Sequence, residues 1–132
     1  MTPGPSGLVV RAAHYPGRAP IDTYGNGGFR FAGMSHRGGI LCLPSGIHGW
    51  EVADARAIDE ESLARMFADA DAIDILLIGT GVGIVPVPAA LRERCRAERI
   101  VVEAMSTGAA VRTFNVLLAE ERAVAAALIA VD

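Results

Sequence analysis

Two nearly continuous apolar runs constrain the fold of this chain more than any other feature. Residues 73–78 form the first run, which ends at glycines, and residues 100–105 form the second. Runs of this kind are typical of strands buried on both faces of a sheet. Residues 89–98 lie between them with a helical pattern, and a strand, helix, strand series of this length favours a right-handed crossover between parallel strands. The sequence therefore predicts an α/β fold.

The remaining segments predict a mixed sheet with about three flanking helices. Short apolar or aromatic runs at residues 29–32, 40–43 and 49–52 alternate with Gly, Asn, Ser and Pro, which predicts short strands joined by turns. Acidic residues at 59–61 precede helical spacing up to residue 70, and residues 107–119 carry an apolar stripe, so both segments are expected to be helices. Residues 123–130 fit either a helix, from their alanines, or a final strand.

Length and composition indicate how many domains the chain forms and in which cellular compartment it is found. The 132 residues suit a single domain, expected at 21–132, after an extended N-terminal arm at 1–20 that holds four of the seven prolines. No apolar stretch reaches the roughly 18 to 20 residues that span a bilayer, and the N-terminus lacks the pattern of a secretory signal. Two cysteines far apart in the sequence suggest reduced thiols. We therefore expect a cytoplasmic protein with no transmembrane segment.

Net charge and the distribution of basic residues disfavour nucleic acid as a partner. The formal net charge is −3, and the twelve basic residues are scattered along the chain. A protein that binds nucleic acid usually gathers its basic residues on one face or along one helix. The sequence shows no such gathering.

The stretch from Met105 to Asn115 is the strongest candidate for a functional site. Backbone N–H groups at a helix start lack intrahelical partners and carry the positive end of the helix dipole, so they attract anions. Ser106 and Thr107 supply a hydroxyl-rich start, and Arg112 follows one turn later. Arg112 and Asn115 share a face of the helix with Gly108. The alternative is structural: Arg112 pairs with a carboxylate, and Asn115 ties down a loop.

A glycine loop follows the first apolar run and is expected to face the same groove. Gly79, Thr80 and Gly81 come directly after the predicted strand, where glycine permits tight turns and close approach to a ligand. The pattern lacks the third glycine and the immediate helix of a dinucleotide fingerprint, so a structural turn packed against the third helix is an open alternative. Tyr24 and Trp50 are expected at the rim of this groove, although each also suits a structural role, Tyr24 in a turn and Trp50 over the sheet.

Residue content argues against several kinds of catalysis. The chain has no lysine, which excludes a P-loop lysine and Schiff-base chemistry. Its three histidines lack metal-ligand spacing, and neither Ser45 nor Ser106 lies in a nucleophile-elbow motif. We therefore expect no catalytic residue, no metal site and no cofactor.

Separated motifs in a fixed order resemble one known family. They are the segment from Tyr24 to Phe29, residues 76–81, the start of the third helix at residues 105–107, and residues 112–120. These resemble the Mth-domain family, which includes mitochondrial complex I assembly factors and adipogenesis-associated proteins. The resemblance implies a single α/β domain with a hammerhead-like β portion, and a final strand over residues 123–131. This chain has Glu121 where the family pattern usually has glycine.

These observations favour a non-catalytic interaction module. By resemblance it would be an assembly or accessory factor for a protein complex of the respiratory complex I type, with a protein partner. The alternative is a small-anion or nucleotide-binding protein, which could be an enzyme, that uses the loop at Gly79 to Gly81 and the helix start at Ser106 to Asn115. The sequence leaves open whether the chain forms a homo-oligomer.

Overall fold

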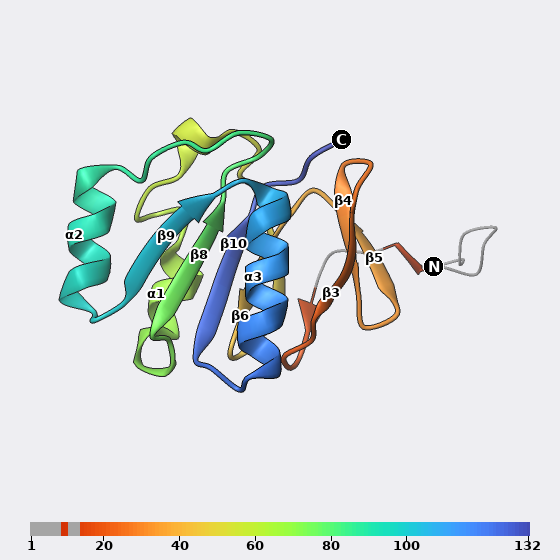
Figure 1. Cartoon of the computed structure of the whole chain (residues 1–132), viewed down its shortest axis with the longest axis horizontal. Coiled ribbons are helices and arrows are strands. Elements are labelled where there is room, and N and C mark those ends of the chain that lie inside the picture. Colours follow the sequence, from red (N-terminus) through yellow and green to blue (C-terminus); the bar gives the residue numbers. More distant parts are fainter. Residues whose placement is uncertain (1–8, 11–13) are drawn as a thin grey trace.

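The computed structural model describes residues 9–10 and 14–132, which form two sheets and three α-helices (Figure 1). One sheet has the strand order β1-β5-β4-β3, and the other has the order β2-β7-β6-β10-β8-β9. The strands are β1 (Val9–Val10), β2 (His14–Tyr15), β3 (Ile21–Gly25), β4 (Gly28–Phe31), β5 (Met34–Arg37), β6 (Gly39–Leu43), β7 (Gly46–Trp50), β8 (Ile75–Gly79), β9 (Val101–Met105) and β10 (Val124–Leu128). The helices are α1 (Ala64–Ala68), α2 (Ala89–Ala97) and α3 (Thr107–Ala119), with 3₁₀ turns at Ala55–Ala57 and Ala70–Ala72.

The larger sheet is mixed, and the last strand of the chain lies inside it. Strand β10 pairs in parallel with β8 and antiparallel with β6, and β8 pairs in parallel with β9. Every residue of β10 is buried, as expected for a strand covered on both faces. The N-terminal β hairpins and the C-terminal α/β unit therefore meet along β10.

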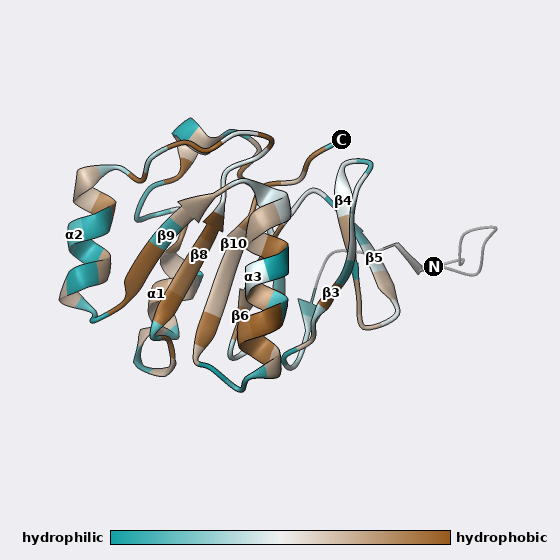
Figure 2. Ribbon diagram, viewed as in Figure 1, coloured by the Kyte–Doolittle hydropathy of each residue, from teal (hydrophilic) through white to brown (hydrophobic). Residues whose placement is uncertain are grey.

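Two hydrophobic clusters lie on opposite faces of the larger sheet. Helices α1 and α2 pack on one face, where Met66 and Leu91 meet Leu76 and other sheet residues. Helix α3 and the smaller sheet cover the other face, where Phe114 and Phe31 meet Leu77. Figure 2 shows apolar residues along β8, β9 and β10 between these layers. Successive side chains along a strand point to opposite faces of the sheet, so each strand contributes residues to both clusters.

The structure confirms the mixed α/β fold and most of the predicted elements. The expected strands at 73–78 and 100–105 correspond to β8 and β9, which are parallel, and the third helix has the predicted bounds. Residues 123–130, ambiguous by propensity, form strand β10, as the family resemblance implies, although the strand is shorter than 123–131. The smaller sheet forms a separate β portion, as the resemblance also implies.

Two local predictions, the helix at 59–70 and the strands before residue 53, differ from the structure. The expected helix over residues 59–70 is reduced to α1, because Asp59 and Ser62 exchange side-chain to backbone hydrogen bonds that hold a turn before it. The strand expected at 49–52 lies earlier, at β7, and strands β3 and β5 were not predicted. The described part of the N-terminal arm contributes β1 and β2, which pair with β5 and β7.

None of the helices in the described residues combines the length and the apolar character needed to cross a membrane.

Candidate functional site at the start of helix α3

Gly79 ends β8 directly against the first turn of α3. A Cβ atom at this position would lie 2.9 Å from Thr107 Cα and 3.0 Å from a Leu128 methyl group, closer than side chains tolerate. The first glycine of the loop therefore serves the contact between strand and helix. This is the packed structural turn that the sequence left open.

Gly81 adopts a backbone conformation that favours glycine. Its φ angle is +104°, while a Cβ built on it would meet no atom within 4 Å. Conformation rather than crowding thus explains this glycine. The Gly81 carbonyl accepts a hydrogen bond from the Thr107 N–H at 2.8 Å, and its N–H donates to Thr107 Oγ1 at 3.1 Å.

Thr107 joins the glycine loop, the helix start and the end of the last strand. Its side chain is fully buried, and its hydroxyl donates to the Ile129 carbonyl at 2.6 Å while it accepts from Gly81. Both hydrogen-bonding capacities of this hydroxyl are therefore used inside the protein. Thr107 supports the site and does not offer its hydroxyl to a ligand.

Ser106 is the N-cap of α3. Its Oγ accepts a hydrogen bond from the Ala109 N–H at 3.3 Å, and its carbonyl accepts from the Ala110 N–H at 2.9 Å. This is the usual role of serine at a helix start. Of the first three N–H groups of α3, only that of Gly108 has no acceptor among the described residues.

Thr80 fixes the loop that leads from β8 toward α2. Its hydroxyl donates to the Gly83 carbonyl at 2.6 Å and accepts from the Val85 N–H at 3.1 Å. Its own N–H donates to the Met105 carbonyl at 2.9 Å, where β9 ends. The buried Thr80 side chain thus fixes the backbone conformation of residues 80–85.

Arg112, Asn115 and Gly108 share the face of α3 that turns toward β3. The Asn115 amide makes two hydrogen bonds to the Ile21 backbone: its Oδ1 accepts from the N–H at 2.8 Å, and its Nδ2 donates to the carbonyl at 2.9 Å. Asn115 therefore fastens β3 to the helix, which is the structural alternative raised by the sequence. Arg112 is exposed and makes no ion pair within the described part of the chain.

Of the two expected rim residues, only Tyr24 lies near α3. Its side chain is 40% exposed, and a Cβ on Gly108 would collide with its hydroxyl. Trp50 is buried in the cluster on the opposite face of the larger sheet, where its Nε1 donates to the Ser62 carbonyl at 2.8 Å. The structure does not bring Trp50 together with the helix start.

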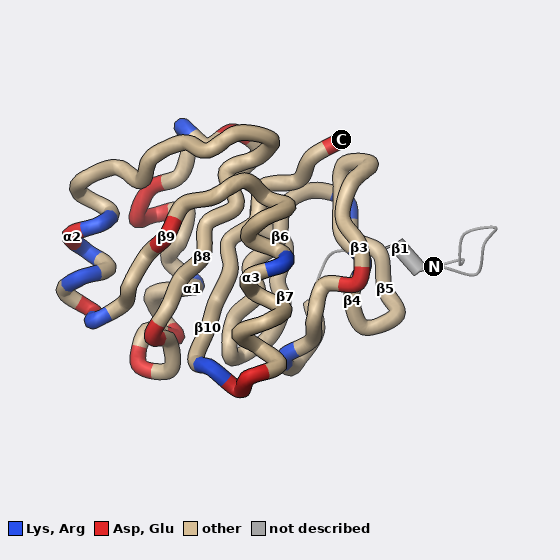
Figure 3. Tube along the Cα trace, viewed as in Figure 1, with Lys and Arg blue, Asp and Glu red and all other residues tan. Residues whose placement is uncertain are grey.

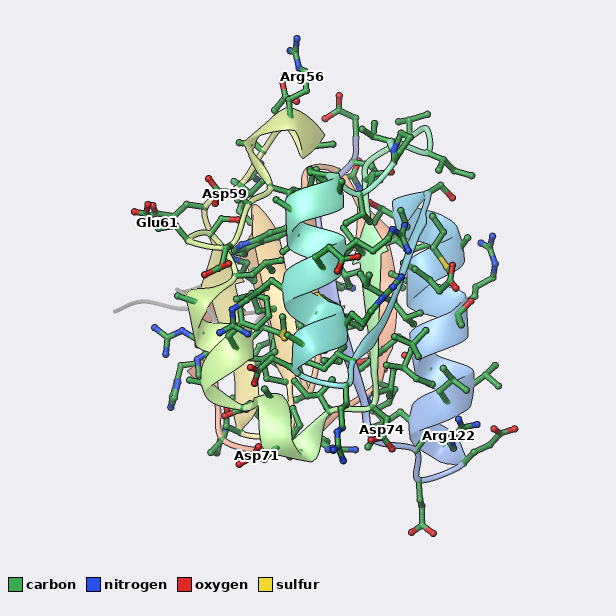
Figure 4. All side chains as sticks on the ribbon, turned by 90° about the vertical axis from the view of Figure 1, so that its left-hand side faces the viewer. Arg56, Asp59, Glu61, Asp71, Asp74 and Arg122 are labelled. Carbon is green, nitrogen blue, oxygen red and sulfur yellow. The ribbon has the colours of Figure 1, made fainter. Side chains whose placement is uncertain are left out.

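Charged residues are found mainly on α2 and on the turns (Figure 3). Figure 4 shows Arg56, Asp59 and Glu61 projecting from the segment that precedes α1. A hydrogen bond from Arg56 lowers the pKa of the exposed Asp54 carboxyl to about 2. Asp74 and Arg122 lie at the opposite end of the molecule from Arg56, near the turns that precede β8 and follow α3.

Neither cysteine is suited to reaction or to ligation. Cys42 and Cys95 are buried free thiols that belong to the clusters on opposite faces of the larger sheet. Burial raises the pKa of both thiols, which disfavours the reactive thiolate. The described residues contain no group of three or more His, Cys, Asp or Glu side chains that could hold a metal ion.

An exposed apolar loop beside the helix start was missed by the sequence analysis. Val82 is 88% exposed and Ile84 is 67% exposed, in the loop that Thr80 holds. The signal was available, because no charged residue occurs between Asp74 and Arg92. The glycines of the same segment are the stronger local signal, but they do not indicate which side chains are exposed.

The family model described as protein of unknown function (DUF498/DUF598) matches residues 21–129, which include strands β3 to β10, the three helices and the loop after β8. The chain belongs to this family. A Rhodobacter capsulatus member called an uncharacterized protein is 40% identical over 92% of this chain and 93% of its own length. NADH dehydrogenase [ubiquinone] 1 alpha subcomplex assembly factor 3 of Xenopus tropicalis is 34% identical over 83% of this chain. The matched region spans 60% of that assembly factor.

Solved structures of other members share the DUF498/DUF598 fold. A crystal structure described as an outer membrane protein of Bartonella henselae superimposes with a TM-score of 0.87 at 58% identity, covering 90% of this chain and 100% of that one. An NMR structure of a Rhodopseudomonas palustris protein superimposes with a TM-score of 0.80 at 48% identity, covering 92% of this chain and 90% of that one. A Bordetella pertussis protein described as a Mth938-like domain superimposes with a TM-score of 0.75 at 26% identity, covering 85% of each chain.

Proposed function

We propose that this family member is a non-catalytic interaction module that serves as an assembly or accessory factor for a protein complex, of the respiratory complex I type. The names of its vertebrate relatives support the assembly role. We propose that its partner contacts the apolar loop at residues 82–85 together with Gly81, Ser106 and Arg112. A cytoplasmic location is part of the proposal, supported by the two unpaired thiols.

The exposed apolar loop is the observation that supports this proposal most. Val82, Ile84 and Val85 present apolar side chains to solvent, although loops of this kind are usually polar. Contiguous exposed apolar groups commonly mark contacts with proteins. The hydrogen bonds of Thr80 hold this loop in place, so a partner would meet a preformed surface and lose little entropy in ordering it.

The helix start is less suited to the alternative, an anion or nucleotide site. The N–H groups of Thr107 and Ala109 already donate within the protein, so only the Gly108 N–H remains for an anion near the first turn. Neither the groove over β3 to β5 nor the groove beside Trp50 is lined by Ser106, Thr107 or Arg112. A partner surface agrees better with these features than an enclosed ligand site does.

The test compares two double variants by capture of partners from the native host. V82S with I84S removes the apolar loop surface, while V101S with V116S removes two valines of 58% and 56% exposure elsewhere. We expect the first variant to capture about tenfold less partner and the second to behave like the wild type. Blue native gels then measure assembled complex I in a deletion strain complemented with each variant.

Two outcomes would count against the proposal. Unchanged capture by V82S with I84S would remove the loop from the partner surface. Captured proteins that include no complex I subunit, together with normal complex I in the deletion strain, would refute the complex I assignment. A nucleotide or phosphate that shifts the amide signals of Ser106 and Gly108 would instead favour the alternative.

A further inference from the structure

The outer face of the smaller sheet carries two arginines that the strand register brings together. Arg30 of β4 lies opposite Thr23 of β3 and Ser35 of β5, and Gly28 lies opposite Arg37. Phe29 and Phe31 point into the core, so Arg30 between them faces outward, and its side chain is exposed. Arg30 and Arg37 are therefore diagonal neighbours on the outer face, although they lie seven positions apart in the sequence.

Glycines leave a hollow beside these arginines. Gly25 and Gly28 are paired across β3 and β4, and neither contributes a side chain. The hollow has a volume of about 460 Å³. Hydroxyl groups come from Thr23 and Ser35, and the Arg30 Nε donates to Ser35 Oγ at 3.2 Å, which orients the guanidinium along the sheet.

The hollow is positively charged, and none of the described residues that line it is a carboxylate. Its charged lining residues are Arg30 and Arg37, and neither forms an ion pair with any described residue. Asp22 of β3 does not line the hollow and makes no ion pair with either arginine. Two guanidinium groups on one small face, neither in an ion pair with a described residue, attract an anion.

We propose that this hollow binds the phosphate group of a small phosphorylated ligand. A guanidinium offers paired donors that match the oxygens of a phosphate, and two of them balance its double negative charge. The hydroxyls of Thr23 and Ser35 add neutral donors, and the volume lies within the range of small-molecule sites. This site lies on the small sheet and does not depend on the partner surface around the apolar loop.

The experiment follows the backbone amide signals of the protein during titration with inorganic pyrophosphate at low ionic strength. We expect saturable shifts within residues 23–37, with affinity about tenfold weaker in R30Q or R37Q and no saturation in the double variant. R96Q is the matched control, because it removes an exposed arginine from α2, on the far side of the larger sheet, and should leave the affinity unchanged. Dispersed amide spectra of each variant establish that it folds.

A second arm identifies the source of the phosphate. Phosphatidylcholine vesicles with and without phosphatidic acid are sedimented with wild type and with the R30Q, R37Q double variant. Saturable pyrophosphate binding supports a soluble ligand, whereas binding only to vesicles with phosphatidic acid, lost in the double variant, assigns the phosphate to a lipid headgroup. Absence of binding that depends on Arg30 and Arg37 in both arms would overturn the proposal.

Discussion

Individual residues with left-handed backbone conformation end two of the helices. Glu121 after α3 has a φ angle of +60°, and Arg99 after α2 has +61°. The Glu121 N–H donates to the Leu118 carbonyl and the Arg122 N–H donates to that of Leu117, which is the Schellman arrangement. Glycine is favoured at such positions, so the structure explains why the family pattern usually has glycine where this chain has Glu121.

Replacing Glu121 by glycine should stabilise the protein. Relief of the left-handed strain is worth about 1 to 2 kcal/mol, and the greater freedom of glycine in the unfolded chain offsets part of it, so we expect a gain of about 0.5 to 1 kcal/mol. Urea unfolding of E121G measures the change. E120G is the matched control, because Glu120 has a φ angle of −85° and its replacement should be destabilising. Equal effects of the two substitutions would show that the gain does not come from backbone strain.

Asn115 and Arg112 should separate stability from binding. N115A leaves the N–H and carbonyl of Ile21 without their side-chain partners, which should lower the free energy of unfolding by about 1 to 3 kcal/mol. R112A removes an exposed charge without a described ion pair, so it should change stability little and weaken partner capture more. Thermal unfolding and capture are measured on both variants. A strong loss of stability in R112A with unchanged capture would make Arg112 structural.

The role of Asn115 shows why single residues were hard to assign from the sequence. Its partner, Ile21, is 94 positions away in a strand that the sequence did not predict. Helical spacing placed Asn115 on the correct face with Arg112 and Gly108, but spacing does not reveal what that face contacts. Thr107 is a similar case, because the acceptor of its hydroxyl, Ile129, lies beyond the last strand.

Among the elements, the loop after β8 depends on one hydroxyl. T80V removes the donor to Gly83 and the acceptor for Val85 while keeping the side-chain shape. We expect a loss of about 1 to 3 kcal/mol in the free energy of unfolding and faster amide exchange across residues 81–85. T80S keeps the hydroxyl and serves as the control. If the amide exchange rates of residues 81–85 in T80V equal those of the wild type, other contacts maintain the conformation of the loop.

Elements with a clear periodicity of apolar residues were predicted well. Elements whose conformation depends on tertiary contacts were not. Helix α3 has the predicted bounds, because its cap and apolar stripe are local signals. Strand β10 could not be separated from a helix by its alanines, since its pairing with β6 and β8 decides its conformation. Helix α1 is shorter than predicted for the converse reason: a local Asp59 and Ser62 turn replaces its first part.

At the scale of the whole molecule, stability should depend on pH through His48. This side chain is 8% exposed, its Nε2 has no hydrogen-bond partner among the described residues, and burial, Arg65 and His14 lower its pKa. The unfolded chain therefore takes up a proton at higher pH than the folded protein does. The free energy of unfolding should fall as the pH drops below about 6.5, until the folded protein is protonated too.

Urea unfolding at a series of pH values from about 7.5 to about 5 checks this dependence. This range brackets the usual histidine pKa of about 6.5. H48Q should flatten the slope across this range, because it removes the titrating group. H36Q, in strand β5 of the smaller sheet, is the control for a general effect of replacing a histidine. A slope that H48Q leaves as steep as in the wild type would assign the pH dependence to other groups.

The central position of β10 has a consequence for synthesis of the protein. Until residues 124–128 have left the ribosome, β6 and β8 lack the strand that joins them, and each exposes an unpaired edge. The larger sheet therefore stays incomplete until β10 is synthesised, and its apolar faces are open to aggregation before then. Cellular chaperones that shield nascent strands should therefore affect the yield of this domain more than its final stability.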